Sequence, residues 1–181
     1  MNSTTRHGNF LQINNIGVWL TGEPRIGKST LSLALIDRGH RLISDDAVVL
    51  YDRHDTVIGQ APKSIQGFLW IAGMDVIDVS KLCGNNALLD QCELHVIIHL
   101  IKSAPHNTTE NLFNPTIQTV TLFNQSFPQV IFPMRESHMP LLIETWVRNY
   151  HLKQQGNDAR SALQKQHQHA IAQGIPCNKS D

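Results

Sequence analysis

A glycine-rich stretch near the start of the chain, "GEPRIGKST" (residues 22–30), restricts the possible folds more than any other feature of the sequence. It fills the fixed positions of the pattern G-x-x-x-x-G-K-[ST] with Gly22, Gly27, Lys28 and Ser29. The apolar run "IGVWLTG" before it predicts a strand, and "STLSLALIDRG" after it predicts a helix capped by Gly39. A strand, a glycine-rich loop and a helix in this order form a backbone cradle for phosphate groups.

The loop predicts a nucleotide site in which each polar group has a distinct task. Backbone N–H groups and the positive end of the helix would surround the phosphates, Lys28 would neutralise their oxygens, and the Ser29 hydroxyl would coordinate Mg²⁺. The predicted binding set is Gly22, Glu23, Pro24, Arg25, Ile26, Gly27, Lys28, Ser29 and Thr30. Pro24 has no N–H and removes one donor from this set. The alternative is a glycine turn with an exposed lysine, which the flanking strand and helix argue against.

Two adjacent carboxylates, Asp45 and Asp46, follow the loop in "GHRLISDDAVVL". We expect them at the start or in the middle of a strand, where neighbouring side chains point to opposite faces. Only one of them would then face the phosphates, unless the strand bulges. One carboxylate would support the metal, and the other would accept the proton of an incoming hydroxyl or water. The alternative for this pair is an ordinary polar strand end.

The remaining segments predict an α/β domain with a mixed sheet. "HRLISDDAVVLYD" and "TVIGQAP" flank the polar turn "RHD" and predict a hairpin, whose antiparallel pairing would make the sheet mixed. Further strands are predicted at "ELHVIIHLI", "TVTLF" and "QVIFPM", and a helix is predicted from Pro140 to about Tyr150, with Gly156 beyond its end. The polar segment "SAPHNTTENLFNPT" predicts a loop. A chain of 181 residues fits one domain with a sizeable core.

Charge and cysteine content narrow the choice of partners and compartment. Lys and Arg number 15, as do Asp and Glu, so the formal charge of zero does not favour binding to nucleic acid or to a membrane. The cysteines, Cys83, Cys92 and Cys177, are odd in number and lack C-x-x-C spacing, which favours a reducing compartment over disulfides or a zinc site. The N-terminal stretch carries no apolar signal segment, and the apolar run "VIIHLI" is too short to span a bilayer. We therefore expect a cytoplasmic protein.

The segment "GVWLTGEPRIGKSTLSLALIDRGHRLISDDAVVL" closely resembles the phosphate-loop region of HPr kinase/phosphorylase, since "RGHRLISDD" follows the loop as it does in that family. Further matches are His7-Gly8 in "RHGNF", the stretch "GQAP", and "GFLWIAGMDVIDV" in place of the family signature. The resemblance covers about residues 6–150 and implies a single catalytic domain with a helical tail at residues 151–181. It corresponds to the short proteobacterial forms, which lack the family's separate N-terminal domain. The implied fold is a phosphate loop in a mixed β-sheet flanked by helices, as in phosphoenolpyruvate carboxykinase.

This resemblance implies an ATP- and Mg²⁺-dependent kinase that phosphorylates the phosphocarrier HPr on a serine and catalyses the reverse phosphorolysis, which regulates a phosphotransferase system. Asp45 takes the place of the general base, and Asp46 joins Ser29 at the metal. Lys28 keeps its phosphate role, and His7 corresponds to a histidine beside the active site. The alternative for His7 is a surface residue on a flexible N-terminus. The family also implies a homo-oligomer, a hexamer.

The signature region departs from the family pattern at three positions. Trp70 stands where the family has an acidic residue at the metal site, Ala72 replaces an arginine, and Asp75 replaces a glycine. An indole offers no oxygen to Mg²⁺, so a carboxylate ligand is lost. Asp75 or Asp78 would be the nearest replacements in the sequence.

Other departures lie in two loops. Pro24 and Arg25 replace the usual Ser-Gly of the phosphate loop, and "FPMRESHMP" lacks the Gly-Arg that helps phosphorolysis, with Arg135 as its nearest substitute. These losses leave two alternatives to the HPr kinase. One is a non-catalytic regulator that binds nucleotide on the same fold, and the other is a kinase or NTPase acting on a small molecule. The kinase is favoured because the base, the lysine and the metal-binding serine are all present.

Overall fold

The computed structural model describes residues 2–102, 117–134 and 138–172, and the chain divides into two compact units, residues 1–144 and 145–181. The loop predicted at "SAPHNTTENLFNPT", together with Arg135 and Cys177, lies outside the described residues. The division into a catalytic core at residues 6–150 and a helical tail at 151–181 stays a prediction. No helix in the described part of the chain combines the length and apolar character needed to cross a membrane.

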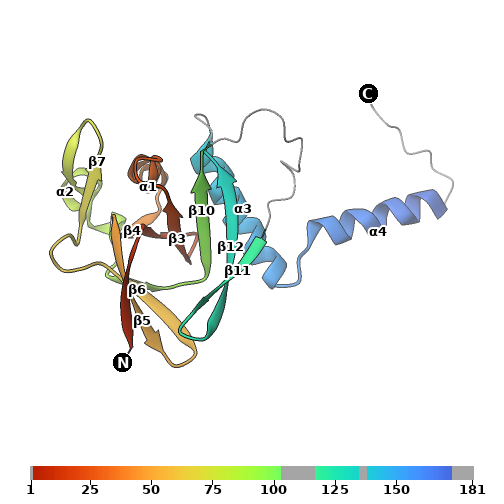
Figure 1. The fold of residues 1–181 in the computed structure, drawn as a ribbon. Coiled ribbons are helices and arrows are strands. Elements are labelled where there is room, and N and C mark those ends of the chain that lie inside the picture. Colours follow the sequence, from red (N-terminus) through yellow and green to blue (C-terminus); the bar gives the residue numbers. More distant parts are fainter. Residues whose placement is uncertain (1, 103–116, 135–137, 173–181) are drawn as a thin grey trace. The chain divides into compact units, whose positions relative to one another are not determined.

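A six-stranded sheet carries the phosphate loop (Figure 1). Its strands, in spatial order, are β11 (Ile117–Leu122), β12 (Gln125–Pro133), β10 (Val96–Ile101), β3 (Ile16–Gly22), β2 (Asn9–Ile13) and β4 (Arg41–Ser44). β10 runs parallel to β3 and to β12, whereas the other neighbours pair antiparallel. The predicted mixed sheet is therefore confirmed, although its antiparallel pairs are not the hairpin that the sequence suggested.

That hairpin belongs to a second, four-stranded antiparallel sheet. In spatial order this sheet contains β1 (Ser3–His7), β5 (Ala47–Arg53), β6 (Thr56–Gln60) and β9 (Gln91–Glu93). β5 and β6 form the predicted hairpin, in which Arg53 pairs with Thr56 across a two-residue turn. Among the strands of the described residues, β5 and β6 pair within this second sheet alone, so the hairpin does not contribute to the sheet that holds the phosphate loop.

A small third sheet and the helices complete the fold. The third sheet pairs β7 (Phe68–Ile71) with β8 (Asp75–Asp78), and the short helices α2 (Val79–Cys83) and η1 (Asn85–Ala87) follow it. The longer helices are α1 (Lys28–Asp37), α3 (Met139–Gln154) and α4 (Ala159–Ala172). The helix predicted from Pro140 is α3, which extends beyond the predicted end at Tyr150.

The core lies between the two larger sheets and beneath α1. Neighbouring residues of β2 face opposite sides: Phe10 packs against Gly59 of β6, whereas Asn9 bonds to Ser32 of α1. The cluster on the Phe10 side joins the two sheets and consists of Phe10, Trp19, Ile43, Val48, Leu50, Val57, Leu94, Ile97, Leu122 and Phe127. On the other side, α1 buries Leu31 and Leu35, which lie one helical turn apart. β2 and β3 are thereby covered on both faces, which fixes the phosphate loop at the end of a rigid strand.

Candidate active site

The phosphate loop begins where β3 ends and finishes where α1 starts, as the sequence predicts. Gly22 has a φ of 141°, and a Cβ atom placed on it would lie 2.5 Å from the carbonyl oxygen of Leu100 on β10. No side chain fits there, so the first glycine of the pattern is needed for close packing of the two parallel strands. Gly27 caps the N-terminus of α1 with a φ of 101°, which leaves the first N–H groups of the helix without a side-chain cap. These free donors suit an anionic ligand.

Lys28 extends back into the loop. Its Nζ atom donates to the carbonyl oxygens of Gly22 and Glu23, each at 3.1 Å, and the residue is buried. Burial lowers the pKa of the ammonium group below its ordinary value, while the negative charges of Asp46 and Asp45 oppose this change. The lysine is thus held among the loop carbonyls, at the place where the sequence predicts the phosphate oxygens.

Asp45 is a buried carboxylate that accepts hydrogen bonds from Ser29, Trp70 and the Asn9 side chain. One oxygen, Oδ1, accepts from the Ser29 hydroxyl at 2.8 Å, and the other, Oδ2, accepts from the backbone N–H of Trp70 at 2.9 Å. The residue is only 4% exposed. Burial raises the pKa of the carboxyl above its ordinary value, although these hydrogen bonds lower it in part. A fixed carboxylate with a raised pKa beside a phosphate loop has the properties of a general base.

The two aspartates lie in a break between strands. β4 ends at Ser44 and β5 begins at Ala47, and Asp46 adopts a left-handed backbone with a φ of 63°. The expected position at the start or in the middle of one strand is therefore wrong. The break separates two different sheets, and it lets Asp45 turn toward the loop while Asp46 turns toward His7.

His7 and Asp46 form a pair at the surface of the site. Nδ1 of His7 lies 3.2 Å from a carboxylate oxygen of Asp46, and the two side chains are 50% and 73% exposed. The next residue, Gly8, donates its N–H to the carbonyl oxygen of Asp46 at 2.9 Å. A Cβ atom on Gly8 would lie 2.5 Å from the carbonyl oxygen of Leu20, so this position also requires glycine. Gly8 thus holds the Asp46 backbone in place, while His7 pairs with the Asp46 side chain.

Asn9 is a site residue that the sequence analysis missed. It is fully buried, its side-chain oxygen accepts from the N–H of Asp46 at 3.3 Å, and its amide donates to Ser32 on α1 at 2.9 Å. Asn9 therefore links the helix that follows the phosphate loop to the turn that carries the carboxylates. The only signal in the sequence is an asparagine that directly precedes the apolar run of a buried strand.

Oxygen donors beside the loop fit a magnesium ion. The described residues contain no group of three or more His, Cys, Asp or Glu side chains that could hold a metal by themselves. Mg²⁺ usually needs fewer protein ligands than this, because phosphate oxygens and waters complete its coordination shell. The Ser29 hydroxyl bonds to Asp45 and the Asp46 carboxylate pairs with His7, so Ser29 and Asp46 as joint metal ligands stay a prediction.

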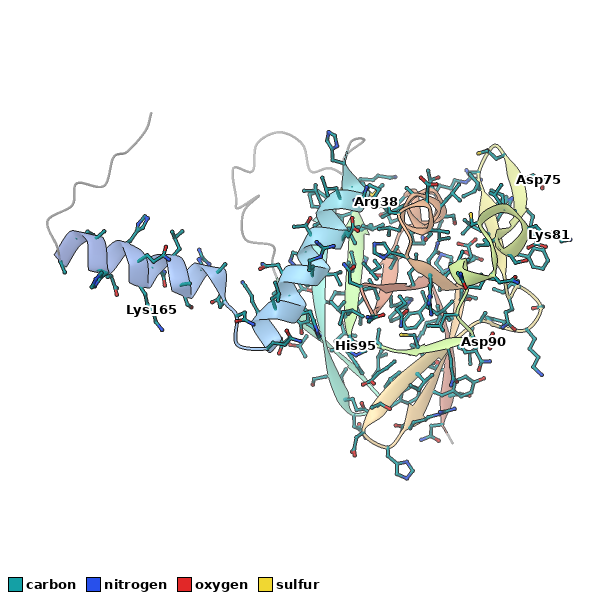
Figure 2. All side chains as sticks on the ribbon, turned by 180° about the vertical axis from the view of Figure 1, so that it is seen from behind. Arg38, Asp75, Lys81, Asp90, His95 and Lys165 are labelled. Atoms are coloured by element: carbon teal, nitrogen blue, oxygen red, sulfur yellow. The ribbon has the colours of Figure 1, made fainter. Side chains whose placement is uncertain are left out.

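Trp70 contributes its backbone to the site, whereas its side chain faces solvent. The N–H of Trp70 on β7 donates to Asp45, and the residue is 64% exposed. Asp75, labelled at the tip of the β7–β8 hairpin in Figure 2, accepts from the N–H of Val76, and Asp78 caps α2 through the N–H of Lys81. Both acids are engaged in local hydrogen bonds, so neither is held toward Asp45.

A family model described as the HPr serine kinase C-terminal domain matches residues 1–167. The chain belongs to this family. The resemblance that the sequence analysis stated is thereby confirmed, and the α/β fold with a mixed sheet flanked by helices agrees with it.

Relatives of this HPr serine kinase domain are known from several bacteria. The HPr kinase/phosphorylase of Lacticaseibacillus casei is 34% identical over 167 residues, which cover 91% of this chain and 52% of that protein. The enzyme of the same name from Pediococcus pentosaceus is 37% identical over 161 residues, which cover 88% of this chain and 51% of that protein. The chain thus spans about half the length of the curated relatives it matches. The solved structure of the Hpr(Ser) kinase/phosphatase from Coxiella burnetii is 43% identical, with a TM-score of 0.77, and covers 84% of this chain and 99% of that one.

Proposed function

We propose that this chain is an ATP- and Mg²⁺-dependent protein kinase that phosphorylates HPr on a serine and catalyses the reverse phosphorolysis, in regulation of a phosphotransferase system. Family membership supports the class of reaction. The observation that carries the proposal is the geometry of Asp45, a buried carboxylate oriented by Ser29 and Trp70 beside the phosphate loop. A carboxylate in this position can accept the proton of a serine hydroxyl.

Each group has a defined task in this reaction. The loop N–H groups and Lys28 hold the phosphates and neutralise charge that develops on them during transfer. Asp45 takes the serine proton in the kinase direction and the proton of inorganic phosphate in the reverse one, and its raised pKa makes it a stronger base than an exposed aspartate. His7 and Asp46 border the reacting atoms, and Asp46 with Ser29 would hold Mg²⁺. When bound, the ion supplies positive charge to the phosphate oxygens.

The test of the proposed base is transfer of radiolabelled phosphate from ATP to HPr. Asp45→Asn should abolish phosphoserine formation and leave ATP affinity, measured by calorimetry, within about threefold of the parent value. The asparagine can still accept from the Trp70 N–H, so the local structure should be kept. Asp37→Asn is the matched comparison, because it removes an exposed carboxylate at the end of α1 that lies away from the phosphate loop, and it keeps the base. An unchanged transfer rate in Asp45→Asn would refute the assignment.

A nucleotide-binding regulator without efficient transfer is the second candidate. Two observations favour it: Trp70 occupies the place of an acidic residue near the metal, and Pro24 offers no N–H to the phosphates. It predicts ATP binding without phosphoserine on HPr in the same assay, whereas the kinase predicts both.

We also propose a cytoplasmic hexamer. The described cysteines, Cys83 and Cys92, are free thiols, which fits a reducing compartment. The hexamer is proposed from the family alone, and sedimentation of the purified protein tests it.

A further inference from the structure

The phosphate loop carries a proline and an arginine that its pattern does not require. Pro24 cannot donate a backbone hydrogen bond, so the loop has one donor fewer for the phosphates. Arg25, the next residue, is exposed and has a φ of 63°, in the left-handed region. Glycine adopts this conformation without cost, whereas an arginine does not. The backbone of the loop therefore gives no reason for an arginine here.

The other charged groups of the loop already have partners. Lys28 is buried and bonds to two loop carbonyls, and the Glu23 carboxylate lies 3.4 Å from Nζ of Lys102. Within the described ranges, no residue forms a hydrogen bond or ion pair with the Arg25 guanidinium. Arg25 is thus a cation at the mouth of the loop that remains available to a ligand.

The charge balance of the site indicates which ligand this cation suits. Glu23 and Lys102 offset each other, while ionised Asp45 and Asp46 outweigh the single charge of Lys28. Without Arg25, the protein's own side chains would present a net negative charge to a nucleotide that is itself a polyanion. A guanidinium offers several N–H donors in a planar fork that matches phosphate oxygens, and it stays charged at every physiological pH.

We propose that the Arg25 side chain binds the phosphate chain of the nucleotide and replaces the contact that Pro24 cannot make. The inference rests on the proposed function only in taking this loop as the nucleotide site. It makes Arg25 a binding residue through its side chain, in addition to the backbone role predicted for every residue of the loop.

Calorimetry with Mg²⁺ and two ligands, ATP and inorganic tripolyphosphate, tests this assignment. Arg25→Gly should lower the affinity for ATP and for tripolyphosphate by the same factor, about tenfold, because tripolyphosphate has the phosphates of ATP without the base and ribose. The melting temperature of the free variant should equal or exceed that of the parent, since glycine relieves the left-handed backbone. Arg25→Lys keeps the charge without the planar fork, so its affinity should lie between those of the parent and of Arg25→Gly. Arg53→Gln, at the end of β5, controls for the loss of one positive charge elsewhere.

The outcomes separate this inference from the proposed function. Equal affinity of parent and Arg25→Gly for ATP would overturn the role of Arg25 and leave the kinase proposal intact. If Arg25→Gly lost affinity for ATP and not for tripolyphosphate, Arg25 would contact the base or ribose, and the proposed phosphate contact would be wrong. An equal loss of affinity in Arg53→Gln would also overturn the proposal. Conversely, a tenfold loss in Arg25→Gly, together with no transfer to HPr by the parent, would support the phosphate contact and refute the kinase.

Discussion

Replacing Asp45 with asparagine should stabilise the folded protein at neutral pH while it removes the proposed base. Asp45 is 4% exposed, and burial raises the pKa of its carboxyl. An acid with a raised pKa in the folded state favours folding when it is protonated, and this contribution is lost as the pH rises through the folded pKa. Asparagine has almost the same shape and never carries the charge. It therefore avoids the cost of burying a carboxylate and still accepts from the Trp70 N–H.

The size of the stabilisation by Asp45→Asn depends on the interactions that favour and oppose an ionised Asp45 in the folded parent. Ser29, Trp70 and the Asn9 side chain each donate a hydrogen bond to the carboxylate, and such a bond contributes about 1.5–3 kcal/mol when the acceptor is charged. The raised pKa means that burial, together with the nearby charge of Asp46, outweighs these hydrogen bonds. Loss of the attraction between Asp45 and Lys28 offsets part of the gain. We therefore expect Asp45→Asn to be more stable than the parent at pH 7 by an amount comparable to one such hydrogen bond, about 1–2 kcal/mol, which corresponds to a rise in Tm of about 2–8 °C for a domain of this size.

Urea denaturation of both proteins between pH 8 and pH 4 measures this difference. The extra free energy of unfolding of Asp45→Asn over the parent should be largest at neutral pH. It should shrink as the pH falls, because the Asp45 carboxyl of the folded parent then takes up a proton. Asp46→Asn is the matched control. The Asp46 side chain is 73% exposed, and its substitution removes a surface pair with His7, so the free energy of unfolding should change by less than about 1 kcal/mol. An Asp45→Asn variant that is less stable than the parent at pH 7, or a gain that does not vary with pH, would refute the reasoning.

Three further substitutions test other parts of the site. Lys28→Ala should weaken ATP binding at least about tenfold in calorimetry, and equal affinity would mean that the loop does not bind phosphate. Asn9→Ala removes the hydrogen bonds to Ser32 and to the Asp46 N–H, and it should lower the free energy of unfolding, measured in urea, by about 2–4 kcal/mol. Ser32→Ala removes the bond between Asn9 and Ser32 but keeps the bond to Asp46. An equal loss of stability in Ser32→Ala would mean that the bond to Asp46 contributes nothing. Trp70→Glu restores an acidic side chain and should raise Mg²⁺-dependent transfer to HPr, while no gain would mean that other ligands hold the metal.

The elements around the phosphate loop could be predicted because they depend on short-range pattern. "IGVWLTG" coincides with β3, and α1 is followed by a left-handed Gly39 whose N–H bonds to the carbonyl of Ile36. In both cases the deciding residues are neighbours in the sequence. The β5–β6 hairpin was predicted for the same reason. Its place in a second sheet could not be predicted, since that depends on pairing with β1 and β9.

The start of β12 was missed because of a proline and an unusual turn. "QVIFPM" covers only the second half of the strand, which begins at Gln125 and includes Pro128. Pro128 is tolerated because β10 begins to pair with β12 only at Gln129. The turn that joins β11 to β12 consists of Phe123 and Asn124, both with positive φ, and phenylalanine is not a residue that signals such a turn.

Asp45 and Asp46 show why a correct choice of residues did not give a correct geometry. The sequence placed both on one strand, where alternation would allow only one of them to face the phosphates. The backbone instead breaks after Ser44, and the contacts that hold the break come from distant segments: Gly8 and Asn9 bond to Asp46, and the Trp70 N–H bonds to Asp45. None of these partners is near in the sequence, so no local pattern contains the information.

Left-handed residues other than glycine show where local preference gives way to the requirements of the site. Asn14 and Asn15 adopt positive φ in the two-residue turn between β2 and β3, where such a turn demands it. Arg25 and Asp46 have a φ of 63° each and lie in no such hairpin turn. Each costs of order 1 kcal/mol that a glycine would not. Positive φ also occurs at Asp75 and His138, outside the phosphate loop. Arg25 stands in the phosphate loop and Asp46 beside the proposed base, so at these two positions a charged side chain is kept where the fold alone would be better served by glycine.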